Sequence, residues 1–203
     1  MYLVKTPSVL RPLARDLTWK IETWNKEVYL TFDDGPTPIV TEKVLELLRM
    51  YGAKATFFCL GKNVEAHPEI YEKILADGHT TGNHSYNHPD GWKTPTVSYL
   101  KNIILGTRSI NSRLYRPPYG RITLQQIHAL KKKYRIIMWD VLSGDFDRDI
   151  TKEECLQNVI DNTDAGSIVV FHDSEKAKSN MLFALEESLK YFHAEGYILR
   201  AIT

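Results

Sequence analysis

Two adjacent carboxylates, Asp33 and Asp34, stand in the stretch Thr31-Phe32-Asp33-Asp34-Gly35-Pro36. The apolar run Val28-Tyr29-Leu30 before them predicts a buried strand, and Gly35-Pro36 marks the end of that strand as a turn. Because neighbouring side chains of a strand point to opposite faces, the two carboxylates cannot both point the same way. That geometry suits a division of labour in which one carboxylate binds a metal and the other accepts a proton. Taken alone, the stretch is better explained as a polar turn.

Two histidines, His84 and His88, lie four residues apart in His84-Ser85-Tyr86-Asn87-His88. On a helical turn such a pair lies on one face and can share a metal. With Asp34 they form a set of three protein ligands, which is typical of a catalytic Zn²⁺ with one open position. The same ligand types suit non-haem Fe(II). On spacing alone, two histidines in a solvated loop explain the pattern equally well.

Two further segments carry groups that suit hydrolysis. In Arg116-Pro117-Pro118-Tyr119-Gly120 the prolines have no N–H, so the first free backbone donor after Arg116 is that of Tyr119, a candidate oxyanion donor. Arg116 is suited to bind a carboxylate bidentately. His172 ends a strongly apolar run and is a candidate general acid, while Asp173 is expected only to begin the next loop. In isolation, a surface Pro-Pro loop and a core histidine would explain these segments better.

The elements that must position these groups alternate between strand and helix, and the alternation predicts a parallel sheet of β-α units. Strands are expected at 27–32, 53–59, 79–84, 113–116, 135–139, 167–171 and 197–201. Helices are expected at 39–51, 68–76, 97–113, 124–133, 152–162 and 181–194. About seven strands fit a (β/α) barrel, complete or incomplete, with an open doubly wound sheet as the alternative. In both folds ligands gather at the carboxyl ends of the strands, where the candidate residues stand.

The totals describe a single globular domain over residues 1–203, with 1–25 as an irregular N-terminal extension. Hydrophobic residues make up 43% and charged residues 25%, and the net charge of +1 gives no reason to expect a nucleic-acid partner. No apolar run is long enough to span a membrane. The start lacks the continuous apolar segment of a signal peptide, so a cytoplasmic location is the default expectation, or an extracellular or periplasmic one if a leader was removed. Cys59 and Cys155 do not form a disulfide framework, and the sequence does not predict an oligomeric state.

The ordered segments resemble the polysaccharide deacetylase family, also called the NodB-homology domain or carbohydrate esterase family four. The resemblance runs from about Val28 to the C-terminus. The matching motifs are Thr31-Phe32-Asp33-Asp34-Gly35-Pro36, His84-Ser85-Tyr86-Asn87-His88, Arg116-Pro117-Pro118-Tyr119-Gly120 and Val170-Phe171-His172, the last with Val where the family has Leu. The family fold is a distorted (β/α) barrel, in agreement with the alternation of elements.

The resemblance implies a role for each matching residue. Asp34, His84 and His88 would bind a divalent metal. Asp33 would be the general base, held by Arg116. The backbone N–H of Tyr119 would help to bind the oxyanion, and His172 would be the general acid. The family hydrolyses N-acetyl groups on glucosamine polymers such as chitin or peptidoglycan, and in some members O-acetyl groups on xylan.

The fourth family motif, Asp-x-x-Asp-Trp, is only partly matched by Leu142-Ser143-Gly144-Asp145-Phe146. Leu142 stands where the first Asp belongs, and Phe146 replaces Trp. In the family that first Asp partners the acid histidine, and a carboxylate partner raises the pKa of an imidazole. The support for His172 is therefore expected to be missing unless Asp140 or Asp145 reaches it.

The resulting hypothesis is a metal-dependent hydrolase that removes N-acetyl, or alternatively O-acetyl, groups from a carbohydrate such as an N-acetylglucosamine oligomer. The expected cofactor is a divalent metal, with Zn first and Co, Ni, Mn or Fe as alternatives. The expected partner is the acetylated carbohydrate. Because of Leu142, a non-catalytic or weakly active carbohydrate-binding protein is the alternative. A non-haem Fe(II) oxygenase is a third hypothesis, against which the ordered motifs argue. Candidates for stacking on sugar rings are Tyr86, Trp92, Tyr119 and Trp139.

Overall fold

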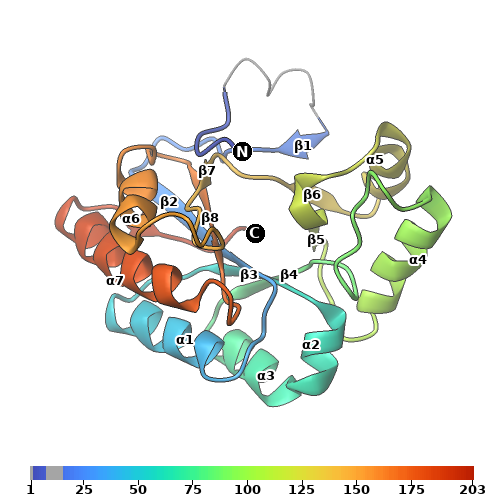
Figure 1. The fold of residues 1–203 in the computed structure, drawn as a ribbon, viewed down its shortest axis with the longest axis horizontal. Coiled ribbons are helices and arrows are strands. Elements are labelled where there is room, and N and C mark those ends of the chain that lie inside the picture. The colour runs from blue at the N-terminus through green and yellow to red at the C-terminus, as the bar shows by residue number, and fades with distance from the viewer. Residues whose placement is uncertain (1, 8–15) are drawn as a thin grey trace.

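A curled parallel sheet organises the molecule, which a computed structural model describes at residues 2–7 and 16–203 (Figure 1). The strands are β1 (Leu17–Thr18), β2 (Glu27–Asp33), β3 (Thr56–Cys59), β4 (Thr80–Asn83), β5 (Leu114–Tyr115), β6 (Arg135–Ile137), β7 (Val141–Leu142), β8 (Ile168–His172) and β9 (Ile198–Leu199). Their order along the sheet is β1-β6-β5-β4-β3-β2-β8-β7, with β9 paired to β2. The predicted distorted barrel is confirmed, and it gains β1 and β7 beyond the seven expected strands.

Helices cover the outside of the curled sheet (Figure 1). They are α1 (Val40–Met50), α2 (Gly61–Ala66), α3 (Pro68–Ala76), α4 (Thr96–Gly106), α5 (Leu124–Leu130), α6 (Lys152–Ile160) and α7 (Lys178–Ala194), with a three-residue 3₁₀ turn η2 (Pro118–Gly120). The sequence did not predict α2, which is too short to show a helical period. The helix expected at 97–113 ends seven residues early, because Gly106 packs against the backbone of Ser85 and the chain turns there.

The two faces of β2 have different roles. Phe32 stacks between Phe57 and Phe171, with ring centroids 5.0 and 5.9 Å away, in the core beneath the helices. Thr31 and Asp33 alternate with Phe32 and therefore point to the other face, inside the barrel. The sequence pattern thus sends apolar side chains to the helices and polar ones to the barrel interior, where the site is built.

The remaining core features agree with the sequence. Cys59 packs in the main hydrophobic cluster, and both cysteines are free and buried. Within the described part of the chain, no helix is both long enough and apolar enough to cross a bilayer.

N-terminal residues add to the edges of the sheet. β1 pairs in parallel with β6, and farther along Lys20 bridges Ser167 in the antiparallel sense. Lys5 bridges Val141 of β7, also antiparallel. The assignment of the whole chain to one domain with an irregular extension at 1–25 stays a prediction, and residues 8–15 of that extension lie outside the described residues.

Candidate active site

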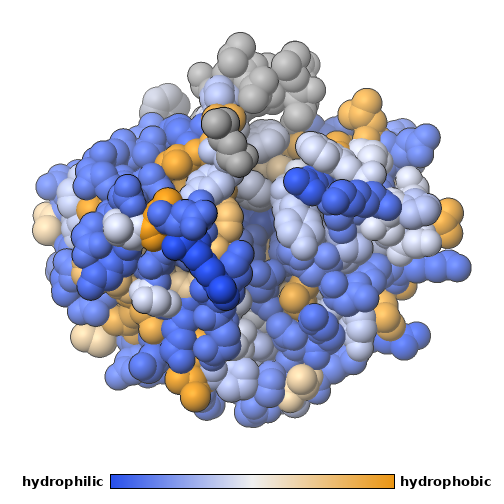
Figure 2. Space-filling view, in the orientation of Figure 1, coloured by the Kyte–Doolittle hydropathy of each residue, from blue (hydrophilic) through white to orange (hydrophobic). Residues whose placement is uncertain are grey.

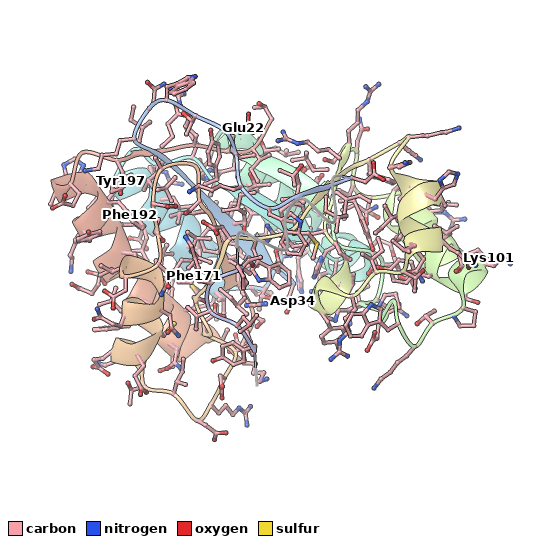
Figure 3. The ribbon with its side chains drawn as sticks, turned by 90° about the horizontal axis from the view of Figure 1, so that it is seen from above. Glu22, Asp34, Lys101, Phe171, Phe192 and Tyr197 are labelled. Atoms are coloured by element: carbon pink, nitrogen blue, oxygen red, sulfur yellow. The ribbon has the colours of Figure 1, made fainter. Side chains whose placement is uncertain are left out.

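A cavity of about 470 Å³ lies at the carboxyl ends of the strands. Figure 2 shows a hollow near the middle of the face seen in Figure 1, and Figure 3 places Asp34 near the centre of the molecule, with Lys101 of α4 at its periphery. The lining residues are Tyr2, Asp33, Asp34, His84, His88, Tyr119, Arg121, Trp139, Leu142, Phe146, Val170, His172, Ser174 and Lys176. Every predicted catalytic or metal-binding residue lines this cavity except Arg116, which lies buried beneath it.

Asp34, His84 and His88 form a cluster suited to a metal ion. One ligand atom from each lies within 4.8 Å of the others. Asp34 Oδ1 is 3.3 Å from His88 Nε2 and 3.8 Å from His84 Nε2, and it is buried without a hydrogen-bond partner among the described residues. His84 Nδ1 lies 2.9 Å from the carbonyl oxygen of Arg116, to which it donates, so that Nε2 is left as the ligand atom. An orphaned carboxylate oxygen beside two such imidazoles fits a divalent cation.

The loop that carries the two histidines is not a helical turn, so that part of the prediction is wrong. Ser85 and His88 have left-handed φ values of 71° and 64°. The Ser85 N–H donates to Asn83 Oδ1 (2.6 Å), and the His88 N–H donates to Ser85 Oγ (3.1 Å). Side-chain hydrogen bonds therefore shape the loop and bring the two imidazoles together, with ring centroids 5.0 Å apart.

The electrostatics of the cluster favour the protonation states that bind metals. Burial, and next the neighbouring His84, lower the pKa of His88 to about 4. Burial acts to raise the pKa of Asp34, but electrostatic interaction with the surrounding histidines, His172 first, outweighs it and lowers that pKa. A neutral imidazole beside an ionised carboxylate is the form that a cation requires.

Asp33 is held by a guanidinium that has no contact with solvent. Arg116 Nη1 donates to Asp33 Oδ1 (2.7 Å) and to Thr31 Oγ1 (2.8 Å). Nη2 and Nε donate to the carbonyl oxygens of Met138 (3.0 Å) and Ile137 (3.4 Å). The expected bidentate pairing is wrong, because the other guanidinium donors are used by these carbonyls. Arg116 therefore ties Asp33 to the ends of β2 and β6.

His172 has a carboxylate partner, and that partner is Asp145. His172 Nδ1 lies 2.7 Å from Asp145 Oδ1, and the His172 backbone N–H donates to Oδ2 (2.6 Å). Burial acts to lower the pKa of His172, but Asp145 outweighs it and raises that pKa to about 9. The side chain of Leu142 only lines the cavity, and Asp140 bonds to Lys5 instead. Replacement of the first motif carboxylate therefore does not remove the support of the acid histidine.

Tyr119 is fixed above the metal ligands. It has a φ of 58° inside η2, and the turn is closed by hydrogen bonds from Gly120 N–H to the Pro117 carbonyl and from Arg121 N–H to the Pro118 carbonyl, both 3.0 Å. Its ring packs edge-on against His88 at 4.4 Å. Tyr119 lines the cavity, while the oxyanion role of its backbone N–H stays a prediction.

Asp173 has a larger role than the predicted start of a loop. Its Oδ1 accepts the Gly35 N–H (3.1 Å), its Oδ2 accepts the Thr41 hydroxyl (2.5 Å), and its own N–H donates to the Asp33 carbonyl (3.1 Å). Burial raises the pKa of Asp173 to about 8. This buried carboxyl group fixes the turn that carries Asp34, whose φ is 83°. No local pattern marks it, because its partners lie more than 130 residues away.

The other residues that were missed or misjudged are aromatic. Tyr119 and Trp139 line the cavity, as expected of sugar-stacking candidates, but Tyr86 and Trp92 are not among its lining residues. Tyr86 instead donates its hydroxyl to Glu65. Tyr2 lines the cavity without having been predicted.

Comparison with known sequences places these features in a family. A family model described as polysaccharide deacetylase matches residues 20–135. A peptidoglycan-N-acetylglucosamine deacetylase of Bacillus cereus is 38% identical over 74% of this chain, which spans 58% of the length of that relative. A second Bacillus cereus protein of the same name is 32% identical over 89% of this chain and 88% of its own. A chitooligosaccharide deacetylase of Azorhizobium caulinodans is 33% identical, over 86% and 92% of the two chains.

Solved structures give the same result. The Bc1960 peptidoglycan N-acetylglucosamine deacetylase has a TM-score of 0.87 at 29% identity, over 97% of this chain and 95% of its own. Peptidoglycan deacetylase PdaC from Bacillus subtilis has a TM-score of 0.81 at 30% identity, over 90% of each chain. BA3943, described as a CE4 family pseudoenzyme from Bacillus anthracis, has a TM-score of 0.79 at 25% identity, over 92% and 67%. From its motifs, its fold and these relatives, the chain belongs to the polysaccharide deacetylase family.

Proposed function

We propose that this protein is a metal-dependent deacetylase that removes N-acetyl groups from N-acetylglucosamine oligomers of the chitin or peptidoglycan type. One observation carries the proposal. A single cavity joins a metal-binding cluster, a carboxylate held by Arg116, and a histidine held by Asp145. The relatives that match most of this chain are named for peptidoglycan and chitooligosaccharide deacetylation.

The cluster of Asp34, His84 and His88 would hold a divalent cation, and zinc is the proposed ion because two imidazoles and one carboxylate form a common catalytic zinc set. When bound, the cation would supply Lewis acidity at the acetyl carbonyl. Asp33, paired with Arg116 at 2.7 Å, would accept the proton of the attacking water. The Tyr119 N–H would donate to the oxyanion.

His172 would complete the reaction by protonating the leaving sugar amine. With its pKa raised to about 9 by Asp145, the imidazole stays protonated at neutral pH and can donate. Each proton transfer of this kind typically contributes roughly 10²- to 10⁴-fold in rate. Asp33 and His172 thus divide base and acid between two groups with different environments.

The proposal is tested by measuring acetate release from N-acetylglucosamine oligomers and from an O-acetyl xylan oligomer, each with added Zn²⁺ or with chelator. We expect release from the N-acetylated sugar that depends on metal. Faster acetate release from the xylan oligomer would show that the substrate is an O-acetyl ester instead of an N-acetyl amide. Absence of release from both, with metal bound, would overturn the proposed activity.

Substitution of Asp33 by Asn tests the base. The amide cannot accept the proton, so we expect kcat to fall by roughly 10²- to 10⁴-fold, while metal content stays at the wild-type value. Asp149→Asn, an exposed change on a neighbouring loop, serves as the control. Wild-type turnover in Asp33→Asn would refute the assignment of the base.

Sugar binding without acetate release is the competing function. It was suggested by Leu142, and a family pseudoenzyme shares the fold. The Asp145–His172 pair removes the main argument for it. Family membership argues against the oxygenase hypothesis.

A further inference from the structure

An N-terminal arm, residues 2–6, runs along β7 in the direction opposite to the rest of the sheet. The Leu142 N–H donates to the Val4 carbonyl (2.8 Å), and the Thr6 N–H donates to the Asp140 carbonyl (2.9 Å). Lys5 anchors the arm through an ion pair of 2.8 Å with the buried carboxylate of Asp140. In Figure 1 the N-terminal end of the chain lies beside β7. β7 runs toward the cavity, and the arm runs antiparallel to β7. The first residues of the arm therefore lie at the cavity.

The register of the arm determines which residue arrives there. Val4 lies opposite Leu142 and Thr6 opposite Asp140, so Tyr2 lies opposite Gly144. Gly144 has a φ of 80°, and a Cβ built on it would lie 2.7 Å from the Tyr2 hydroxyl oxygen. The glycine therefore leaves the space that the Tyr2 side chain occupies.

The Tyr2 ring forms part of the cavity wall. It lies 5.1 Å from the ring of Phe146, and Phe146 lies edge-on to His172 at 5.2 Å. Both Tyr2 and Phe146 line the cavity. The Tyr2 hydroxyl is hydrogen-bonded to Asp147 at the outer end of the ring. The phenol is thus anchored by its polar end, and its apolar ring faces the site.

We propose that Tyr2 is a substrate-binding residue whose ring packs against the apolar face of the sugar that carries the acetyl group. This inference rests on the proposed function and deepens it. Pyranose rings present C–H faces that pack on aromatic side chains, and a tyrosine tethered by its hydroxyl offers such a face at little entropic cost. Tyr119 and Trp139 reach the cavity from the ends of β5 and β6, whereas Tyr2 and Phe146 reach it from the arm and the loop after β7. The arm would thereby contribute to the recognition of the sugar.

The experiment compares Tyr2→Ala, Tyr2→Phe and Leu3→Ala. Leu3 is the adjacent arm residue, is 62% exposed and does not line the cavity, so it is a matched control. Affinity for an N-acetylglucosamine tetramer is measured by calorimetry in the Asp33→Asn background, so that the sugar is not consumed. KM and kcat are measured by acetate release with Asp33 present.

We expect Tyr2→Ala to weaken binding and raise KM by roughly tenfold with kcat nearly unchanged, since one aromatic contact is lost. Tyr2→Phe keeps the ring but loses the tether to Asp147, so its affinity should lie between those of Tyr2→Ala and the unsubstituted protein, whereas Leu3→Ala should leave the affinity unchanged. Equal affinity for the tetramer in Tyr2→Ala and Leu3→Ala would overturn the inference, as would Tyr2→Phe behaving like Tyr2→Ala.

The same measurements separate this inference from the proposed function. If the Asp33→Asn protein binds the tetramer but the protein with Asp33 releases no acetate, the proposed activity fails, and the affinities still decide the role of Tyr2. If acetate is released and the variants do not differ, the activity stands and the role of Tyr2 is refuted. If the parent neither binds nor deacetylates the sugar, both are overturned.

Discussion

At the scale of single residues, the site depends on charges that are held inside the protein. Arg116 and Asp33 are both buried, and their attraction offsets part of the cost of taking each charge out of water. The guanidinium also stacks 4.1 Å above the Phe58 ring. Loss of either partner leaves an unpaired buried charge, which typically costs about 3–5 kcal/mol. The pair therefore holds the Asp33 carboxylate in one position.

Asp145→Asn tests the support of the acid. Without the carboxylate, burial dominates and the pKa of His172, now about 9, should fall by roughly one to three units. Because His172 must be protonated to donate, activity is lost as pH rises through this pKa. The alkaline limb of the pH profile of kcat/KM should move to lower pH by the same amount.

The matched control for Asp145→Asn is Leu142→Asn, at the other motif position. It alters the cavity wall but leaves the Asp145–His172 hydrogen bonds in place, so its alkaline limb should stay where it is in the parent. If the alkaline limb of the kcat/KM profile stays at the same pH in Asp145→Asn, a group other than Asp145 sets the pKa of His172.

Residues that end a strand and carry a motif could be predicted from the sequence. Asp33 and His172 end β2 and β8, and Asp34 and His84 directly follow β2 and β4, so topology brings these four together, whereas His88 is placed by the loop after β4. The partner of His172 could not be predicted, because two carboxylates, Asp140 and Asp145, lie near residue 142 and the sequence does not choose between them. The choice of Asp145 is made by the course of the chain after β7.

At the scale of elements, close contact between strands sets the position of the base. Gly82 in β4 lies opposite Phe58 in β3. A Cβ on Gly82 would lie 2.4 Å from the Phe58 ring, so only glycine lets that ring lie across the strand. The same ring supports the guanidinium of Arg116. The absence of a side chain at Gly82 in β4 therefore helps to position the Arg116 guanidinium, through the Phe58 ring of β3.

Gly82→Ala should displace Phe58 and with it Arg116. We expect a destabilisation of about 1–3 kcal/mol from overpacking, measured by urea unfolding, together with a fall in kcat. Thr80→Ala, on the same strand, removes atoms instead of adding them and should leave kcat unchanged. Wild-type stability and turnover in Gly82→Ala would refute the coupling.

The long elements were the predictable ones. Helix α1 shows a clear apolar period and was predicted to within one residue at each end. The two-residue strands β1 and β7 are too short for a period-2 pattern to appear, and they exist only because neighbouring strands bind them. The loop of His84 and His88 is shaped by side-chain hydrogen bonds that spacing rules do not contain.

At the scale of the whole molecule, metal binding should be linked to stability. The three proposed ligands come from loops after β2 and β4, and an ion that binds only the folded state stabilises it by mass action. At a concentration of 100 times Kd the gain is about 2.7 kcal/mol. For a chain of this size that raises Tm by roughly 5–10 °C.

Thermal unfolding with and without Zn²⁺ measures this effect. The double variant His84→Ala/His88→Ala should lose the shift, while His128→Ala, an exposed histidine on α5, should keep it. A shift that persists in the double variant would place the responsible ion elsewhere.

The antiparallel arm also bears on the order in which the protein is made. Lys5 leaves the ribosome 135 residues before its partner Asp140, which at ordinary speeds of translation is a wait of roughly 7–27 seconds. During that interval the arm has no edge to pair with. Strands β2 to β6 are synthesised first, and the arm finds its place only after β7 and the neighbouring strand β8 have emerged. The segments that carry the proposed metal ligands are therefore made before the proposed sugar-binding position of Tyr2 can form.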